Sequence, residues 1–273
     1  MTTDEHAEKE QVVYVYGVAS GTLDLSAAPR GVEGAAVVAV EDGGLSALCS
    51  FVSGSDYTGE PIEARVGDVD WVGPRATAHD AVLTWASDHA EVVPFTMFTL
   101  FSGADSVEAM LRQRHPSLAK TLERVRGARE YTLRVYQSTA PADGTALVES
   151  DPRIAELEKL AAEARPGQRY LLERKLEKAR QEERARSGAA VAADVASTLA
   201  ANSVDVVRSQ LPSTPDPDAG GRAVLDASFL VKLEKVDELR SALGTLVERY
   251  ERRGFRFEFT GPWPAYHFAR ASD

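Results

Sequence analysis

Hydrophobic and polar positions in the first part of the chain follow a strand pattern with a tight turn. Residues 12–18 (VVYVYGV) are apolar on both faces and rich in β-branched and aromatic side chains, which predicts a central strand covered on both sides. Residues 37–40 and 45–52 predict two more strands. Between them, Glu41-Asp42-Gly43-Gly44 supplies the positive φ that a hairpin turn needs. The chain therefore opens with a strand, a loop and a hairpin.

Two amphipathic helices are predicted after this hairpin. One helical face carries residues at positions i, i+3, i+4 and i+7, namely Val82, Trp85, Ala86 and His89. Pro74 predicts the start of this helix, because its missing N–H would be unpaired in the first turn anyway. Residues 91–101 return to a strand-like composition. Asp105 or Ser106 then predicts the cap of a second helix, which Pro116 is expected to break or restart.

A second domain is predicted to begin near residue 129. Residues 131–136 (YTLRVY) alternate between two faces, as a strand does. Asp151-Pro152 combines a capping acid with a proline at the first helical position, which predicts a helix start. The helical pattern continues through a charge-dense segment and then through the alanine- and valine-rich residues 187–211. The composition of residues 213–221 predicts a loop.

The C-terminal section predicts a strand, a helix and a strand. Residues 225–233 alternate with one mainly apolar face, and Gly254 fits the position that ends the amphipathic helix after them. Phenylalanines at alternate positions of residues 255–259 predict the next strand. Elements joined so tightly form a βαβ unit with a right-handed crossover. Together with residues 131–136 this gives one strand fewer than a ferredoxin-like sandwich needs.

The predicted fold class is therefore α+β with two domains, which agrees with a length of 273 residues. Residues 1–128 form an N-terminal domain of mixed helices and strands. Residues 129–273 form the C-terminal domain, with a long helical insertion. The tail at residues 262–273 is a candidate to pack back on the first domain.

Charge and hydropathy restrict the class of partner. The chain has 31 Lys and Arg against 42 Asp and Glu, a net charge of −11, which argues against broad binding to nucleic-acid phosphates. Residues 153–186 differ, with ten cations and seven acids. Such a mixed-sign helix is usually solvated, and a partner-binding face is the alternative. The chain starts with an acidic, polar segment and has no apolar run near the roughly 20 residues of a membrane span. We therefore expect a soluble, intracellular protein with no nucleic-acid or lipid-membrane partner.

Residues able to support catalysis or bind metals do not form known patterns. No two histidines have the i, i+4 spacing of a helical metal site, and the five are His6, His79, His89, His115 and His267. Phosphate-binding glycine motifs and the G-x-S-x-G elbow do not occur. Asp68 and Asp70 are weak candidates for a cation, and Cys49 in its apolar strand is expected to be a buried, inert thiol. The expectation is no catalytic residue, no cofactor and no metal.

Two apolar and aromatic segments remain as candidates for protein binding. Residues 92–101 (VVPFTMFTLF) form either a buried central element or an edge that docks an apolar partner. In residues 261–268 (GPWPAYHF), prolines stop the preceding strand and hold three rings on an extended tail. These rings either pack between the domains or form an exposed contact patch. The candidate partner-binding residues are Pro94, Phe95, Trp263 and Tyr266.

Four segments in register resemble the gas vesicle protein F/L family. They are YVYGV near the start, VVPFTMFTLFSG near residue 100, YLLERKLEKARQEE in the charged helix and FTGPWPAYHF near the end. Their order and spacing are similar to that family over nearly the whole chain. One departure is visible, because relatives have an Arg-Phe-Gly type of continuation after Pro94, where this chain has residues 95–98 (FTMF).

The resemblance implies an accessory or minor structural protein of gas vesicle formation, without enzymatic activity. It implies two α+β domains, the second a modified ferredoxin-like fold. The implied partners are the small, hydrophobic main shell protein and other gas vesicle accessory proteins, and the implied location is the gas vesicle and the cytoplasm. No catalytic residue follows from it. An acidic protein with local apolar grooves suits the task of keeping an apolar shell protein from aggregating.

Three other functions are weighed against this one. A ferredoxin-like module that senses a small molecule would require a polar-lined pocket. An enzyme would require a cluster of titratable side chains in one cleft. RNA binding by the second domain would require exposed aromatic rings with basic neighbours, whereas the phenylalanines of residues 255–259 are expected to be buried under the helix.

Overall fold

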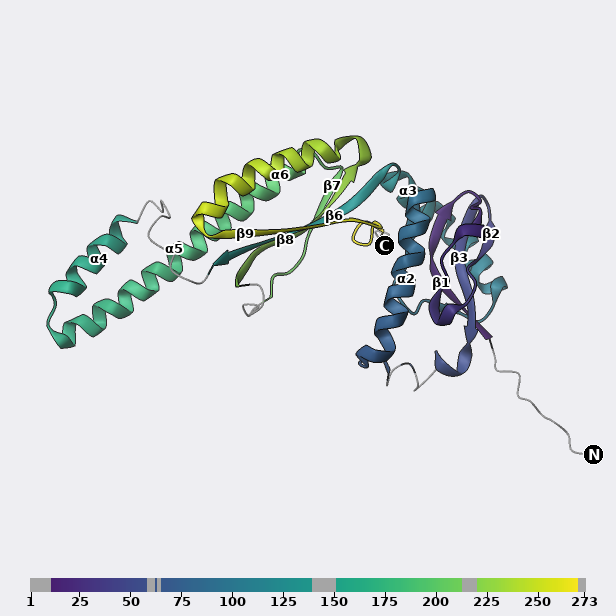
Figure 1. The fold of residues 1–273 in the computed structure, drawn as a ribbon, viewed down its shortest axis with the longest axis horizontal. Coiled ribbons are helices and arrows are strands. Elements are labelled where there is room, and N and C mark those ends of the chain that lie inside the picture. The colour runs from purple at the N-terminus through teal and green to yellow at the C-terminus, as the bar shows by residue number, and fades with distance from the viewer. Residues whose placement is uncertain (1–10, 58–61, 63–64, 139–150, 213–219, 270–273) are drawn as a thin grey trace, which may run out of the picture. The chain divides into compact units, whose positions relative to one another are not determined.

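The computed structural model describes residues 11–57, 62, 65–138, 151–212 and 220–269. The chain divides into two compact units (Figure 1). Unit 1 comprises residues 1–130 together with 262–273, and unit 2 comprises residues 131–261. Helices and strands mix in both units, which confirms the predicted α+β class. The loop expected at residues 213–221 lies mostly outside the described residues.

Unit 1 contains a sheet in the order β2-β3-β1-β4, with β5 also paired to β1. Its strands are β1 (Gln11–Ser20), β2 (Val38–Asp42), β3 (Leu45–Ser53), β4 (Val92–Pro94) and β5 (Leu100–Phe101). β1 is buried from Val12 to Ala19, which confirms the predicted central strand. Gly43 and Gly44 turn the β2–β3 hairpin at φ of 59° and 81°, as their sequence predicted.

One helix covers each face of this sheet. The helices are α2 (Val69–His89) and α3 (Ala104–Val125). Successive residues of β1 point to opposite faces. Val13 and Val15 therefore share a buried cluster with α3, whereas Tyr14 and Tyr16 share one with α2. The result is a three-layer arrangement of helix, sheet and helix.

Both helices begin where the sequence did not predict. The Asp68 carboxylate accepts hydrogen bonds from the N–H groups of Asp70 and Trp71, at 3.0 and 3.4 Å, so α2 starts at Val69. The prediction that Pro74 starts this helix is wrong, because Pro74 lies inside it. α3 starts directly after Gly103 without a side-chain cap, so the predicted capping role of Asp105 or Ser106 is also wrong.

Pro116 lies inside α3 and does not end it, which contradicts the predicted break. A proline in a helix removes one backbone hydrogen bond and crowds the preceding turn. However, Leu111, Leu118 and Leu122 on either side of it are buried against the sheet. Burying a leucine side chain contributes about 1.5–3 kcal/mol, so this apolar face outweighs the local loss.

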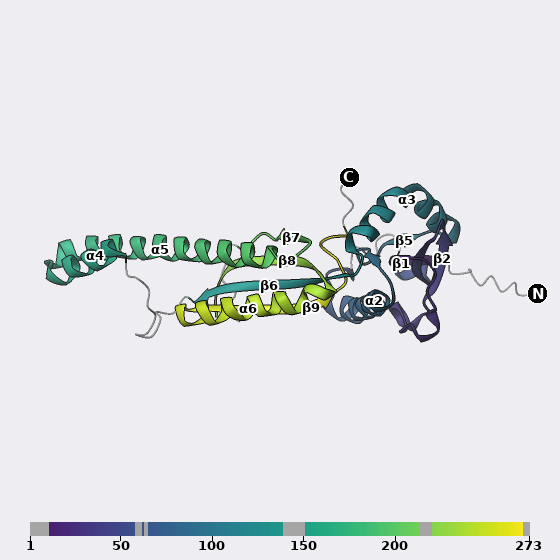
Figure 2. The same cartoon turned by 90° about the horizontal axis from the view of Figure 1, so that it is seen from above.

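Unit 2 contains a four-stranded sheet in the order β7-β8-β6-β9. Its strands are β6 (Ala128–Ser138, which starts in unit 1), β7 (Asp205–Arg208), β8 (Gly221–Lys232) and β9 (Phe255–Trp263). Two helices, α5 (Pro166–Ala200) and α6 (Val236–Tyr250), lie on one face of it (Figures 1 and 2). The order β6-α5-β7-β8-α6-β9 is that of a ferredoxin-like fold.

β7 is the strand that the sequence pattern did not reveal. Residues 187–211 were expected to be helical throughout, but α5 ends at Ala200 and residues 205–208 pair antiparallel with β8. Only four residues long and half-buried, this edge strand is too short for a clear alternation. Pro262 does not stop the strand as predicted, because β9 includes it, whereas β9 does end at Trp263, directly before Pro264. An edge strand tolerates a proline because one side has no partner strand.

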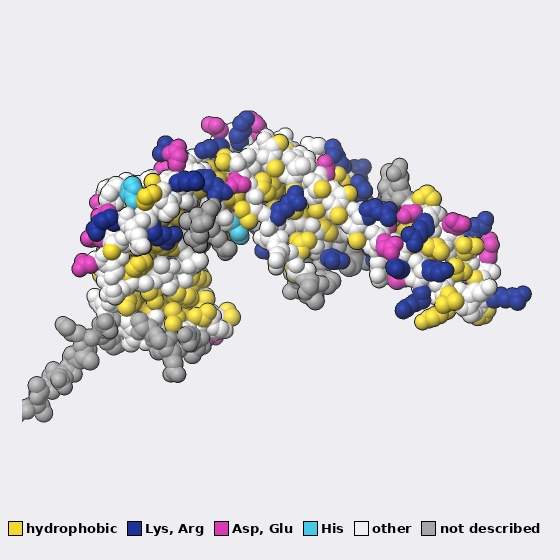
Figure 3. Space-filling model, turned by 180° about the vertical axis from the view of Figure 1, so that it is seen from behind, with side chains coloured by type: hydrophobic (Ala, Val, Ile, Leu, Met, Phe, Trp, Pro, Cys, Tyr) yellow, Lys and Arg dark blue, Asp and Glu magenta, His cyan; other side chains and the backbone are white. Residues whose placement is uncertain are grey.

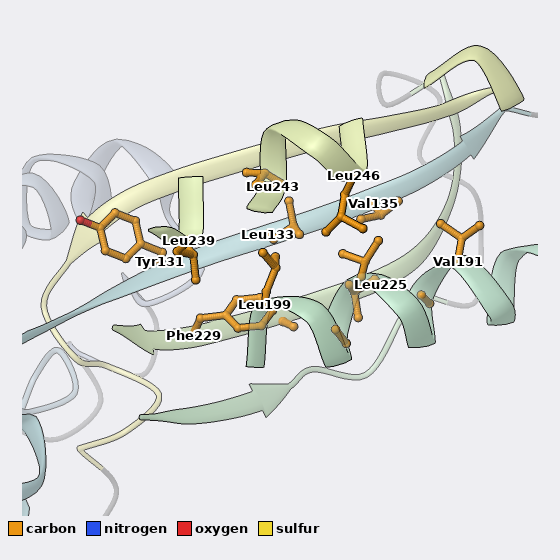
Figure 4. Close-up of a cluster of buried hydrophobic side chains, with 14 of the residues drawn as sticks. Tyr131, Leu133, Val135, Val191, Leu199, Leu225, Phe229, Leu239, Leu243 and Leu246 are labelled. Carbon is orange, nitrogen blue, oxygen red and sulfur yellow. The ribbon is translucent and has the colours of Figure 1, made fainter. Parts of the chain in front are cut away.

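The core of unit 2 lies between its sheet and its two helices (Figure 4). Leu133 of β6, Phe229 of β8 and Leu199 of α5 have no exposed surface. Tyr131 stacks on Phe259 across neighbouring strands, with ring centroids 5.3 Å apart. Gly254 follows the short 3-10 turn after α6 with φ 81°, which confirms its predicted place at the end of the helix.

A helical hairpin extends from unit 2. α4 (Pro152–Glu163) begins where predicted, because Asp151 accepts a hydrogen bond from the N–H of Arg153 at 2.9 Å. α4 lies against the N-terminal half of α5. Ion pairs join the two helices, Arg180 to Glu158 at 2.8 Å and Arg153 to Glu182 at 3.4 Å. None of the described helices is long and apolar enough to cross a membrane.

Candidate partner-binding site

A cavity of about 570 Å³ opens in unit 1. Four elements surround it: α2, the loop between β4 and β5, α3 and the C-terminal tail. Its lining residues are Ala76, His79, Asp80, Pro94, Phe95, Thr96, Met97, Thr99, Arg114, Tyr266, His267 and Ala269. This volume falls in the range of pockets that hold small ligands or protein side chains.

The loop from Phe95 to Thr99 forms one wall of the cavity. It interrupts the expected strand of residues 91–101, so that β4 and β5 pair separately with β1. The loop stays close to β1 because Phe95 donates its N–H to the Tyr16 carbonyl and Thr99 accepts from the N–H of Val15, both at 2.9 Å. These two hydrogen bonds hold the backbone of the loop on β1 and so fix the positions from which its side chains extend.

A buried tyrosine and a buried histidine hold the same loop from below. The Tyr14 hydroxyl lies 2.9 Å from His79 Nδ1 and accepts a hydrogen bond from the N–H of Phe98 at 3.3 Å. The His79 ring is also hydrogen-bonded to the backbone of Phe95. Burial lowers the pKa of His79 to about 4, so the ring is neutral at pH 7 and links loop and sheet without a charge. Burial also raises the pKa of the Tyr14 hydroxyl, which therefore stays protonated at pH 7.

Phe98 belongs to the same loop, does not line the cavity, and has a strained backbone. Its φ is 62°, in the left-handed region that favours glycine. Its ring stacks on Trp71 at 5.4 Å with an interplanar angle of 20°, and meets the edge of Tyr14 at 6.3 Å. These ring contacts offset the backbone strain, since aromatic pairs contribute about 0.5–1.5 kcal/mol beyond their burial.

The tail closes the cavity on the opposite side. Glu130 is 1% exposed and accepts a hydrogen bond from the backbone N–H of His267 at 2.9 Å, while its other oxygen lies 2.6 Å from His267 Nδ1. Tyr266 donates its hydroxyl to Asp80 at 2.7 Å. Burial and the neighbouring carboxylate of Asp80 raise the pKa of Tyr266 well above its usual range. Phe268 follows and is buried at 1% exposure.

The charged groups of the cavity are suited to binding. Arg114 is exposed, and its guanidinium lies 5.5 Å from the centre of the Phe95 ring. The carboxylate of Asp80 already accepts a hydrogen bond from Tyr266. The cavity therefore offers apolar walls with one cation at the edge. Among the described residues, no group of three or more histidine, cysteine or acidic side chains could hold a metal ion.

Three of the four sequence candidates lie in this cavity. Pro94 and Phe95 come from β4 and its loop, and Tyr266 comes from the tail, more than 170 positions later in the chain. Trp263 does not line the cavity; it ends β9 and is 37% exposed. Of the three rings predicted on the tail (Trp263, Tyr266 and Phe268), only Trp263 is exposed, and Phe268 belongs to the interior of unit 1.

Sequence reasoning missed several lining residues and the contacts that hold them. His79 belonged to no predicted site, and it is buried and lines the cavity. Arg114 carried no signal, because an arginine on a helix is ordinary. Glu130 and His267 are 137 positions apart, and no local pattern predicts their contact.

Two other candidates have local structural roles. Asp68, a weak cation candidate, caps α2. Cys49 is fully buried in β3, and burial raises the pKa of its thiol to about 12. The expectation of a buried cysteine is confirmed, and its inertness stays a prediction that the raised pKa supports, since the thiolate is the reactive form.

The chain is built from two α+β units, the second with a ferredoxin-like arrangement, and solved gas vesicle proteins share this fold. The family model of "Gas vesicle synthesis protein GvpL/GvpF" matches residues 12–270. The chain belongs to this gas vesicle F/L family.

Similar proteins cover nearly the full length of the chain. Gas vesicle protein L of Streptomyces sp. is 30% identical over 275 residues, which cover 95% of this chain and 93% of the relative. Gas vesicle protein L2 of Halobacterium salinarum is 28% identical, covering 94% and 90%. The crystal structure of the gas vesicle protein GvpF from Anabaena sp. PCC7120 superposes with a TM-score of 0.72 at 16% identity, over 96% of this chain and all of that one. The predicted family is thereby confirmed, and the chain is a protein of gas vesicle formation.

Proposed function

We propose that this chain is an accessory protein that binds the main gas vesicle shell protein through the cavity of unit 1. In this proposal it acts in the cytoplasm and at the gas vesicle, together with other gas vesicle proteins, to support nucleation or assembly. One observation carries the proposal: Pro94, Phe95 and Tyr266 converge on one cavity. Family membership supplies the biological setting.

Apolar side chains and one arginine line the cavity, and both suit binding of the shell protein. Phe95, Met97 and Ala269 give the cavity an apolar surface that suits a hydrophobic side chain. Arg114 at its edge offers a cation to a carboxylate or a helix C-terminus of the partner. The net charge of −11 keeps the accessory protein dissolved while it shields an apolar client.

Binding of purified shell protein to the purified full chain tests the proposal. We expect retention at micromolar concentration, and a Phe95→Ala variant that binds roughly tenfold more weakly, as expected for an aromatic anchor. Phe51→Ala is the matched control, because Phe51 lies in β3 of unit 1 at 44% exposure and does not line the cavity. No retention at micromolar concentration, or an equal loss in both variants, would refute the proposed binding site.

A small-molecule sensor is a second candidate, because polar groups converge on a cavity of ligand size. Asp80, Arg114 and His267 line the same 570 Å³ as the apolar residues. A thermal-shift screen with metabolites distinguishes the two functions, because a ligand that binds the folded state raises the melting temperature by an amount that grows with the logarithm of its concentration relative to its Kd. A metabolite that raises the melting temperature of the wild type, and fails to do so in Arg114→Ala, would favour the sensor.

A further inference from the structure

The free end of the α4–α5 hairpin is an apolar and basic surface outside the site described above. We define the hairpin tip as residues 160–175, where α4 ends and α5 begins. Leu160, Tyr170 and Leu171 are 45%, 62% and 61% exposed there. Figure 3 shows hydrophobic and Lys or Arg side chains gathered together over this hairpin. Exposed large apolar side chains that cluster mark an interaction surface more often than scattered ones do.

The charges of the hairpin separate along its length. Away from the tip, four of the cations are paired, among them Arg180 with Glu158 and Arg186 with Glu183. The tip holds four cations and only two acids, namely Arg165, Arg169, Arg174, Lys175, Glu163 and Glu173. Within the described part of the chain, no carboxylate lies within 4.0 Å of a tip cation. The tip therefore presents a local positive charge on a chain that is strongly negative elsewhere.

A groove runs between the two helices of the tip. Its volume is about 450 Å³, and its lining residues are Leu160, Glu163, Ala164, Gln168, Leu171, Leu172 and Lys175. Three leucines form its apolar surface and Lys175 provides a cation beside them. A concave apolar groove between two helices accepts the side chains of a third helix.

The charge and the shape of the hairpin tip favour one kind of partner in its groove. An acidic residue next to an apolar one on the partner would meet Lys175 and the leucines at once. An anionic bilayer fits less well, because the leucines line a groove between two helices, which another helix can enter and a flat layer of headgroups cannot. A second copy of this chain also fits poorly: outside the hairpin, none of its described helices carries more than one exposed large apolar side chain.

We propose that the hairpin tip is a docking surface for an amphipathic helix of another protein, whose apolar stripe is flanked by Asp or Glu. The apolar stripe lies in the groove of Leu160, Leu171 and Leu172. The flanking carboxylates pair with Lys175 and the neighbouring cations of the tip. The hairpin tip shares no residue with the cavity of unit 1, so a test of helix binding at the tip is independent of a test of shell-protein binding at the cavity.

A defined peptide pair tests the proposal on the full chain. The probe is a fluorescent helical peptide of about 18 residues with a leucine stripe flanked by glutamates, and its counterpart carries lysines instead. Fluorescence anisotropy is expected to show micromolar binding of the glutamate peptide and at least roughly tenfold weaker binding of the lysine peptide. Leu171→Gln and Lys175→Glu should each weaken the glutamate peptide by roughly fivefold or more.

Matched controls lie on the same unit. Leu233→Gln changes a leucine that is 56% exposed, and Arg240→Glu reverses an exposed cation on α6; both should leave binding unchanged. All four substitutions replace exposed side chains, and circular dichroism checks that each variant folds. Three results would overturn the proposal: no binding of the glutamate peptide, equal binding of both peptides, or equal losses in the control variants. Binding to vesicles of phosphatidylglycerol with no binding of the peptide would overturn it in favour of a membrane contact.

Discussion

The contact between Glu130 and the tail is the best place to test how the cavity of unit 1 is closed. Glu130→Ala removes a buried carboxylate that faces both the backbone N–H and the ring of His267, at 2.9 and 2.6 Å. Hydrogen bonds to charged groups contribute about 1.5–3 kcal/mol each. The His267 side chain is 42% exposed and regains water when released, so the loss should be less than the full sum, about 2–3 kcal/mol.

This loss should appear as local opening of the tail. Phe268 and Ala269 donate their N–H groups to the carbonyl of Ala265 in a turn that depends on the anchored tail. Amide hydrogen exchange of these two residues should accelerate by roughly 30- to 140-fold in Glu130→Ala, since 1.4 kcal/mol corresponds to a factor of ten. Glu130→Gln should have a smaller effect, because its amide oxygen still accepts one hydrogen bond.

A surface glutamate provides the control for this prediction. Glu123 is 64% exposed and forms an ion pair with its helical neighbour Arg126, so its change to alanine should alter tail exchange little. Unchanged exchange at Phe268 and Ala269 in Glu130→Ala would show that the tail is held by other contacts. The reasoning from the two hydrogen bonds would then be refuted.

Three further predictions concern buried groups of unit 1. Cys49, with its pKa raised to about 12, should react with a thiol reagent at pH 8 only when the protein is unfolded. His79 is neutral in the folded protein and takes up a proton more readily when the chain is unfolded. The stability that its neutral form contributes, roughly 3 kcal/mol, should therefore be lost as the pH falls from 6.5 to about 4. The midpoint of urea unfolding should depend less on pH in this window for His79→Gln than for the wild type. At Phe98, glycine should be more stable than alanine by about 1 kcal/mol in urea unfolding, because both lose the ring stack but only glycine relieves a φ of 62°.

Each of these has an outcome that would contradict it. Fast labelling of the native thiol would mean that β3 opens readily. An equal pH dependence in the wild type and His79→Gln would mean that acid sensitivity comes from other groups. An alanine variant of Phe98 as stable as the glycine variant would mean that the left-handed backbone costs little there.

The parts of the fold with strong local signals could be predicted from the sequence. Residues 12–18 are apolar on both faces because two helices cover them, and Asp151-Pro152 marks a helix start through its own cap. Predictions of a helix boundary that rested on a single proline were wrong. Pro74 and Pro116 are helix breakers by propensity, but burial of the neighbouring apolar face decides the outcome in α2 and α3.

The candidate site could be predicted only in part, for a different reason. Pro94, Phe95 and Tyr266 were recognisable because large aromatic residues beside prolines are unusual in a charged chain. Their convergence depends on contacts between distant segments, such as Tyr266 with Asp80 over 186 positions. No periodic pattern encodes such a contact, and β7 was missed because four half-buried residues give no clear period.

The composition of unit 1 has a consequence for biosynthesis. Its first 130 residues emerge from the ribosome early, but its last segment begins at Pro262, after the whole of unit 2 has been translated. Tyr266 and His267 therefore reach Asp80 and Glu130 only when synthesis is nearly complete. A nascent chain has an unfinished cavity, and only a fully translated molecule can present the closed one. Under the function proposed above, the order of translation delays shell-protein binding at this cavity until synthesis is nearly complete.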